Sequence, residues 1–188
     1  MWKTILLNGE KAYVWSPLIA RYAGKSNYDP NLLFLIGPSS DPLKTKIKTF
    51  DIEKKQVVDE IEIKGIRSFH GLLYISSSAS KGVPYVQEFL LLDYSAEACG
   101  ETGGTVYLAF DGKKLRPFFS AAGSGDGGFF EGTEIIFPSD PMGEKGIIHV
   151  VDMGGESGGP SDFLPKVKLD YFTHKKYTWN GEKLIPIE

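Results

Sequence analysis

Apolar and polar residues alternate along much of the chain at or near a period of two. Residues 46–52 and 58–63 combine β-branched or aromatic side chains with Lys, Asp and Glu in this way. Successive side chains of a strand point to opposite faces of a sheet, so this pattern is typical of strands with one buried and one exposed face. The lysines at alternate positions of the first segment are therefore expected on the water-facing side of a sheet.

Short apolar runs form a second class of segment. Each run is bounded by Gly, Pro, Ser or Asp, which is the pattern expected of strands buried on both faces. We find no segment with a convincing helical period. The runs are residues 32–36, 72–75, 89–92, 135–137 and 147–151.

Three tight turns are predicted from one kind of dipeptide. Asn-Gly occurs at positions 8–9 and 180–181, and Asp-Gly occurs at 111–112. These residues tolerate positive φ at both centres of a type I′ turn, whose twist matches that of paired strands. Each dipeptide therefore predicts a tight β-hairpin.

Two longer segments resemble each other, and a third at 73–93 resembles them more loosely. Their last Asp residues are Asp51, Asp93 and Asp152, which are 42 and 59 residues apart and suggest a repeat. Residues 36–51 and 136–152 both contain an apolar strand, a turn rich in Pro, Ser and Asp, and a second strand with Asp near its end. Repeats of about 40 residues with several strands are typical of propeller blades. We predict an all-β fold of mostly antiparallel meander and hairpin units with blade-like repeats, forming a small or incomplete β-propeller. A β-sandwich or a flattened barrel is the alternative.

Length and composition predict one domain covering residues 1–188, because 188 residues with 41% apolar content suit a single core. The apolar runs are far shorter than the roughly 20 residues of a membrane span, so a soluble chain with no span is expected. No signal peptide is visible, which predicts a cytoplasmic protein if Met1 is native, and a periplasmic or extracellular one if a leader was removed. Cys99 is the only cysteine, so no internal disulfide supports the fold.

Charge is unevenly distributed along the chain. Residues 92–162 carry four basic and twelve acidic side chains, whereas residues 1–91 carry twelve basic and nine acidic ones. Nucleic-acid binding requires clustered Lys and Arg, so the acidic middle of the chain argues against it.

The stretch Gly-Gly-Glu-Ser-Gly-Gly-Pro at 154–160 resembles the GDSGGP signature of trypsin-like serine proteases around Ser157. That family also needs a His and an Asp earlier in the chain, and His70 and Asp93 occur in this order. The sequence around His70 differs from the family pattern, and the residues after Pro160 read as a loop rather than a strand. Ser157 is therefore a weak catalytic candidate, and a glycine-rich loop is the preferred interpretation.

The acidic part of the chain is also rich in glycine, with fifteen of the 22 glycines between Gly100 and Gly159. Loops of Gly with spaced carboxylates can present oxygens to a ligand, and Ca²⁺ takes six to eight oxygens. The alternating Asp pattern of known calcium loops is absent, so no cofactor is assigned, calcium remains a low-ranking candidate and the metal is unknown. The predicted binding residues are Glu97, Glu101, Asp126 and Glu131.

Aromatic residues occur in adjacent or closely spaced pairs at 118–119, 129–130, 171–172 and 177–179. Adjacent side chains of a strand face opposite ways, so these pairs are expected mainly to fill core on both faces of a sheet. The alternative is that one ring of a pair is exposed and contacts a partner protein or a sugar ring.

These observations predict a non-enzymatic binding or interaction module, with the glycine-rich acidic loops as its binding end and an unidentified protein or carbohydrate as its partner. One alternative is a hydrolase in which Ser157 or carboxylates assemble in three dimensions. Another is a structural subunit that completes a sheet by association. The oligomeric state is left open.

Overall fold

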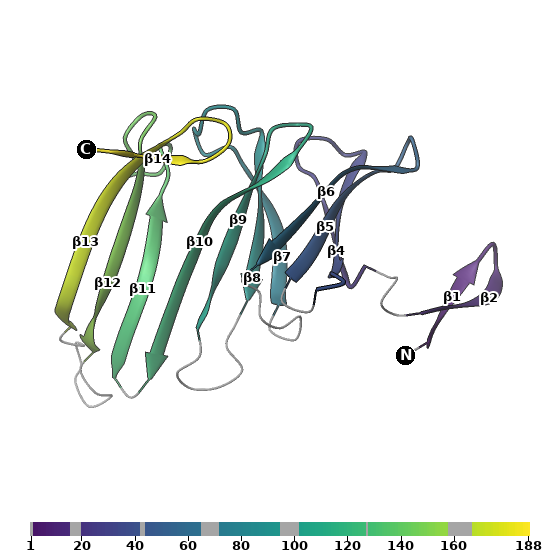
Figure 1. The fold of residues 1–188 in the computed structure, drawn as a ribbon, viewed down its shortest axis with the longest axis horizontal. Coiled ribbons are helices and arrows are strands. Elements are labelled where there is room, and N and C mark those ends of the chain that lie inside the picture. Colours follow the sequence, from purple (N-terminus) through teal and green to yellow (C-terminus); the bar gives the residue numbers. More distant parts are fainter. Residues whose placement is uncertain are drawn as a thin grey trace.

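A computed structural model describes residues 2–15, 20–41, 44–64, 72–94, 102–126, 128–157 and 167–188. Within these residues the chain forms fourteen β-strands and no helix, and every strand pairs with its neighbours in antiparallel fashion (Figure 1). The prediction of an all-β antiparallel fold is confirmed. A helix long and apolar enough to cross a membrane is accordingly missing from the described ranges.

The strands form three sheets in which order in space follows order in sequence. The first is a hairpin of β1 (Trp2–Leu7) and β2 (Glu10–Trp15). The second contains β3 (Tyr22–Lys25), β4 (Leu32–Pro38), β5 (Lys44–Asp51) and β6 (Gln56–Lys64). The third contains β7 (Leu72–Ala79), β8 (Glu88–Tyr94), β9 (Gly103–Phe110), β10 (Leu115–Asp126), β11 (Phe129–Ile136), β12 (Ile148–Ser157), β13 (Val167–Trp179) and β14 (Leu184–Ile187).

The four-stranded sheet packs against β8, β9 and β10 of the eight-stranded sheet. Phe34 and Ile47 of the smaller sheet and Leu90, Leu108 and Phe110 of the larger one are completely buried in a shared core. This packing of two sheets corresponds to the sandwich alternative. The eight strands form one continuous meander rather than separate blades, so the propeller-like prediction is not confirmed.

A second core lies on the other face of β8 and β9. Phe89, next to Leu90, packs with Phe118, Phe137 and Trp179, and the rings of Phe89 and Phe118 are 4.8 Å apart between centroids. The prediction that residues 89–92 are buried on both faces is therefore confirmed for Phe89, Leu90 and Leu92, while Leu91 is half-buried against the second core.

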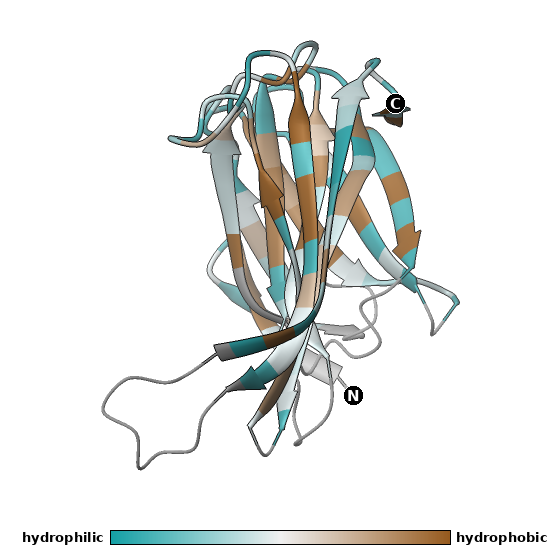
Figure 2. Ribbon diagram, turned by 90° about the vertical axis from the view of Figure 1, so that its left-hand side faces the viewer, coloured by the Kyte–Doolittle hydropathy of each residue, from teal (hydrophilic) through white to brown (hydrophobic). Residues whose placement is uncertain are grey.

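The prediction for residues 32–36 is wrong in one respect. Leu32, Phe34 and Ile36 are buried, but Leu33 and Leu35 between them are only half-buried. They lie on the outer face of the smaller sheet, which no third layer of the described residues covers. Banded hydropathy along the strands is visible in Figure 2.

The outer face of the smaller sheet carries the alternating lysines. Lys46 Nζ lies 2.7 Å from Glu60 Oε1, while Thr45, Ile47 and Thr49 of the same strand are buried. The hydrogen bond from Lys46 holds the pKa of the Glu60 carboxyl below its usual range. The expected water-facing position of these lysines is confirmed.

The predicted hairpins form, but only one has a two-residue turn. Asn8 and Gly9 have φ of 52° and 84° and join β1 to β2 directly. At 111–114 and 180–183 the loops have four residues, because Phe110 pairs with Leu115 and Trp179 with Leu184. The side chains of Asp111 and Asn180 accept hydrogen bonds from backbone N–H groups two and three residues on, which stabilises the longer turn.

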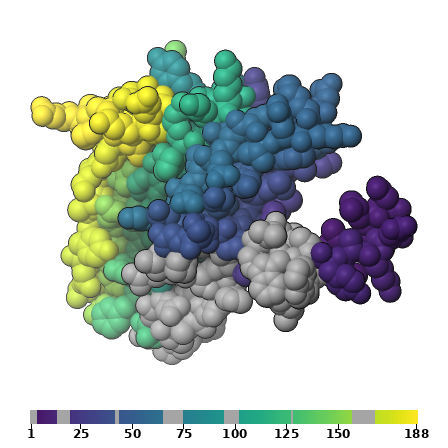
Figure 3. Space-filling view, turned by 45° about the vertical axis from the view of Figure 1, so that its right-hand side comes forward, coloured from purple at the N-terminus to yellow at the C-terminus, as the bar shows by residue number. Residues whose placement is uncertain are grey.

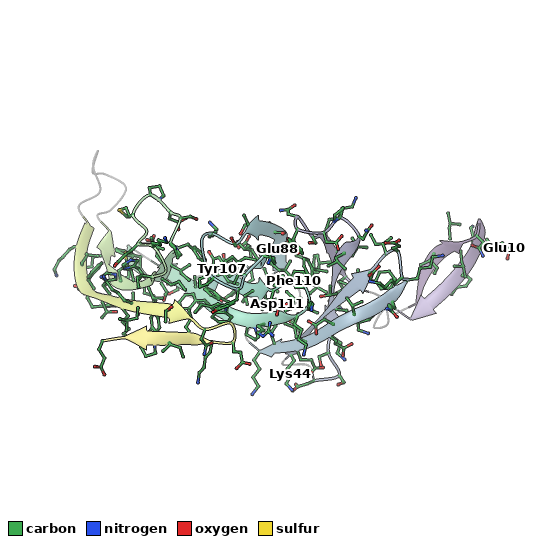
Figure 4. The ribbon with its side chains drawn as sticks, turned by 90° about the horizontal axis from the view of Figure 1, so that it is seen from above. Glu10, Lys44, Glu88, Tyr107, Phe110 and Asp111 are labelled. Carbon is green, nitrogen blue, oxygen red and sulfur yellow. The ribbon has the colours of Figure 1, made fainter. Side chains whose placement is uncertain are left out.

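A buried carboxylate links the two larger sheets. Glu88 begins β8 and is 1% exposed. It accepts hydrogen bonds from the hydroxyls of Ser26 and Ser77, and from the backbone N–H of Asn27 at 2.8 Å. Figure 4 shows Glu88 near Phe110 in the middle of the molecule. Glu88 therefore fixes the 26–28 turn of the smaller sheet onto the edge of the larger one.

Candidate functional site

One end of the eight-stranded sheet extends away from both cores. It is formed by the end of β10, the start of β11, the end of β12 and most of β13, seen at the lower left of Figure 1. Every residue of β13 from Lys168 to Lys176 is exposed, and Leu169, Tyr171 and Phe172 are among the exposed large hydrophobic residues. We call this region the free end of the sheet.

Strand register places five residues of the free end on one face. Asp126 pairs with Phe129 across the β10–β11 hairpin, and Glu131 lies two residues further along β11. Glu131 pairs with Gly154 of β12, which pairs with Tyr171 of β13. Directly paired residues share a face, and so do residues two apart. The sheet therefore assembles these groups from four strands.

A β-bulge shapes the β13 side of this face. Gly154 pairs with Tyr171 and Gly155 pairs with Leu169, which leaves Asp170 as the extra residue. A Cβ on Gly155 would lie 2.1 Å from the backbone oxygen of Lys168, and one on Gly154 would lie 2.5 Å from the Tyr171 ring. Glycine is needed at position 155 because the β13 backbone lies directly against it, whereas at position 154 a side chain would require the Tyr171 ring to move aside.

The arrangement leaves a shallow groove of about 310 Å³. Three aromatic residues line it, and two of them are well exposed: 60% for Phe129 and 45% for Tyr171. The groove is lined by Ser124, Gly125, Asp126, Phe129, Phe130, Glu131, Gly154, Gly155, Asp170 and Tyr171. Glycines of β10 and β12 make its floor flat, because they carry no side chains.

The groove is acidic and rich in hydrogen-bond acceptors. Ser124 Oγ donates to Glu131 Oε1 at 3.0 Å, which orients that carboxylate. Lys168 Nζ lies 3.8 Å from Asp170 Oδ1, but both side chains are well exposed, so this pair neutralises little of the charge. Asp126, Glu131 and Asp170 therefore present three carboxylates at the same groove as Phe129 and Tyr171.

Two of the four predicted binding residues lie in this groove. Asp126 and Glu131 come together because a hairpin of β10 and β11 joins them. Glu97 and Glu101 lie outside the described residues. Asp170 and Tyr171 were not among the predicted site residues, although the pair Tyr171–Phe172 was a signal for an exposed ring.

The aromatic pairs divide between the core and the free end. Phe118 and Trp179 are buried in the second core, as expected for core filling. Phe129, Tyr171 and Phe172 are exposed, whereas Phe130 is half-buried. The core interpretation is therefore wrong for the pair at 171–172 and for Phe129. These two pairs lie where neither face of the sheet is covered by another layer of the described residues.

The arrangement of the strands separates Ser157 from a proposed triad partner. Ser157 is the last residue of β12, and its backbone pairs with Val167. The structure does not describe the Ser157 side chain or residue His70. Asp93 lies on β8, four strands from β12, or about 19 Å at the usual strand spacing. It accepts a hydrogen bond from Thr105 on the neighbouring strand. Ser157 and Asp93 therefore do not form a triad.

Metal ligands do not cluster in the described part of the chain. No group of three or more His, Cys, Asp or Glu side chains there could hold a metal ion. The carboxylates of the groove can accept hydrogen bonds from a ligand.

Comparison of the chain with protein-family models, curated proteins and solved structures finds no match. A functional assignment therefore rests on the groove and on the residues that line it.

Proposed function

We propose that this protein is a non-enzymatic binding module and that the groove at the free end of its eight-stranded sheet holds a carbohydrate. The observation that carries the proposal is the placement of Phe129 and Tyr171 at one groove with the carboxylates of Asp126, Glu131 and Asp170. The groove is open and its floor is formed by glycines, so it suits a flat ligand that is only partly enclosed.

Sugar rings match this combination of groups. The C–H faces of a pyranose are apolar and pack against aromatic rings, while its hydroxyls donate hydrogen bonds around the rim. Carboxylates accept up to four hydrogen bonds each, and bonds to a charged acceptor are the stronger ones. A volume of about 310 Å³ is at the small end of ligand pockets, which favours one or two sugar units.

Charge narrows the class of sugar. Asp126, Glu131 and Asp170 would repel the carboxylates of a uronic acid chain. A neutral chain donates hydroxyls without this repulsion, and an amino sugar adds a favourable charge. The expected ligands are therefore neutral or amino sugars.

The test is isothermal titration of the full chain with cello-, manno- and chito-oligosaccharides, and with oligogalacturonate as the anionic probe. Binding by at least one neutral or amino-sugar probe, and no binding of oligogalacturonate, is expected. In the double variant Phe129→Ala, Tyr171→Ala the affinity should fall at least tenfold, because the stacking surfaces are gone.

Phe172→Ala provides the matched control. Phe172 is 57% exposed and follows Tyr171 in the same strand, on the opposite face of the sheet. The control should bind as the wild type does. Equal loss in both variants, or binding of a lysine-rich peptide in the groove with no sugar bound, would contradict the carbohydrate assignment.

A subunit that completes a sheet by association is a second candidate role, favoured by the β1–β2 hairpin. In Figure 3 this hairpin lies to one side of the two larger sheets, and it exposes Leu6, Leu7 and Tyr13. An isolated two-stranded hairpin is marginally stable in water, so a partner surface would stabilise it. Sedimentation velocity over a hundredfold concentration range tests this role, since an association through the hairpin should weaken in Leu6→Ser. A monomer at every concentration would contradict it.

A further inference from the structure

A pair of histidines lies on the other face of β12 and β13, away from the groove. His149 Nδ1 is 2.8 Å from His174 Nε2, and the two ring planes are inclined by 20°. The ring centroids are 5.0 Å apart. This is close to the largest separation that the nitrogen–nitrogen distance allows, which is reached when the two nitrogens lie on the line between the centroids. The rings therefore lie end to end in nearly one plane, joined by a direct N–H···N hydrogen bond.

The two rings have different surroundings. His174 is exposed, whereas His149 is 7% exposed and its Nε2 has no hydrogen-bond partner. Glu144 Oε2, from the 138–147 loop, is 3.7 Å from that nitrogen. The Glu144 carboxylate favours the tautomer of His149 that carries its proton on Nε2. In this tautomer His149 Nδ1 is unprotonated, so it accepts the hydrogen bond that His174 Nε2–H donates.

Charged groups from three elements surround the pair. Lys176 of β13 pairs with His149 in register, and its Nζ forms a 2.8 Å ion pair with Glu144. Glu134 of β11 pairs with Val151, the partner of His174, and so lies on the same face. On β14 the residue paired with Lys176 is the uncharged Ile187. Burial, then the nearby His174 and Lys176, hold the pKa of His149 below its usual range.

Protonation of this pair proceeds in two unlike steps. A proton on His174 Nδ1 leaves the N–H···N bond intact, because His174 Nε2–H still donates to His149 Nδ1. A second proton occupies His149 Nδ1, the atom that accepts the bond, and puts two positive charges at 2.8 Å. The second step therefore requires the rings to separate.

We propose that His149 and His174 form a pH-sensitive clasp, which holds the 138–147 loop and β13 against β12 near neutral pH and opens when the pair is doubly protonated. The loop is held through Glu144, which contacts both Lys176 of β13 and His149 of β12. Opening would free this edge of the sheet, while the groove lies on the opposite face.

The sign of the pH effect follows from the proton count. Below the ordinary histidine pKa of about 6.5, the unfolded chain protonates His149, whereas the clasped state cannot take a proton at His149 Nδ1 without losing the hydrogen bond. Stability is therefore fully present above this pH and decreases as pH falls toward the lowered pKa of His149. The unfolding equilibrium constant should rise by about tenfold for each pH unit in this window.

The first measurement is a long-range ¹H–¹⁵N spectrum of the full chain titrated from pH 8 to pH 4.5. His149 is expected as the Nε2–H tautomer at pH 8, and the pair should titrate in two separated steps. Hydrogen exchange of the amides at 143–147 and of Lys176, corrected for intrinsic rates, should accelerate with the second step.

Two variants make the test decisive. His174→Asn changes an exposed side chain and should fold. Between pH 7 and pH 5, its unfolding equilibrium constant should rise by a factor at least threefold smaller than that of the wild type. His149→Gln should abolish the acceleration of exchange. The proposal is overturned if the two rings titrate independently in the wild type, or if the loop amides exchange alike at pH 5 and pH 7.5.

Discussion

The eight-stranded sheet is covered on both faces in one half and on neither face at its free end. In β8 and β9, side chains on both faces are buried, whereas nine consecutive residues of β13 are exposed. The covered half is built from Leu, Val and Phe, and the free end from Gly, Ser, Asp and aromatic residues. One continuous sheet thus combines a packed half with an exposed end, and the exposed end is where we propose that the ligand binds.

The largest expected difference between the two regions comes from removing one aromatic ring in each. Phe110→Ala deletes a completely buried ring that packs edge-on against Phe34. It should destabilise the protein by about 3–5 kcal/mol in urea unfolding followed by far-UV circular dichroism. Phe129→Ala at the free end should cost no more than about 0.5 kcal/mol. Similar losses in both variants would show that the free end is packed against something.

The next effect tests the link between the sheets. Glu88→Leu keeps the volume but leaves Ser26, Asn27 N–H and Ser77 without their acceptor. Buried donors without partners are costly, so a loss of about 2–3 kcal/mol is expected in the same unfolding assay. Glu88→Gln, which retains one acceptor oxygen, is the control and should lose less. Wild-type stability in the leucine variant would mean that these hydrogen bonds do not hold the sheets together.

A smaller effect distinguishes two adjacent glycines of the free end. Gly155→Ala places a methyl group against the backbone oxygen of Lys168, which cannot move away without disturbing the bulge, and should cost about 1–2 kcal/mol. Gly154→Ala meets only the Tyr171 ring, which can rotate, so its cost should be lower. Sugar affinity is the second measurement. In Gly154→Ala the new methyl group should displace the Tyr171 ring, so the affinity for sugar should fall although the protein remains folded.

The smallest effect is expected in the hairpin. Leu6 is 74% exposed, so Leu6→Ser should change the stability of the dilute protein by less than about 0.5 kcal/mol. Thermal unfolding at low and high protein concentration measures it. A clear loss at low concentration would indicate that the hairpin packs against the body of the same chain.

The sequence was most informative where neighbouring residues determine the structure. Periodicity identified the buried run at 89–92 and the lysine face of β5, and Asp126 and Glu131 meet because a local hairpin joins them. Asp170 and Tyr171 reach the same groove through the pairing of β12 with β13, and a bulge sets their direction. Periodicity does not encode that pairing, and it does not show which part of a sheet has a covering layer. This is why the exposed rings of Phe129 and Tyr171 resembled core positions.

The order of the strands also has a consequence for how the chain folds. In both larger sheets each strand pairs with the one before it, so every hairpin can form as soon as its second strand is synthesised. The contacts between the two sheets form later, because they join residues about 60 positions apart in the chain. The hydrogen bonds of Glu88 with the 26–28 turn are an example. Assembly is therefore expected to proceed from the amino-terminal side in small local steps, with the docking of the two sheets as the slow step that completes the core.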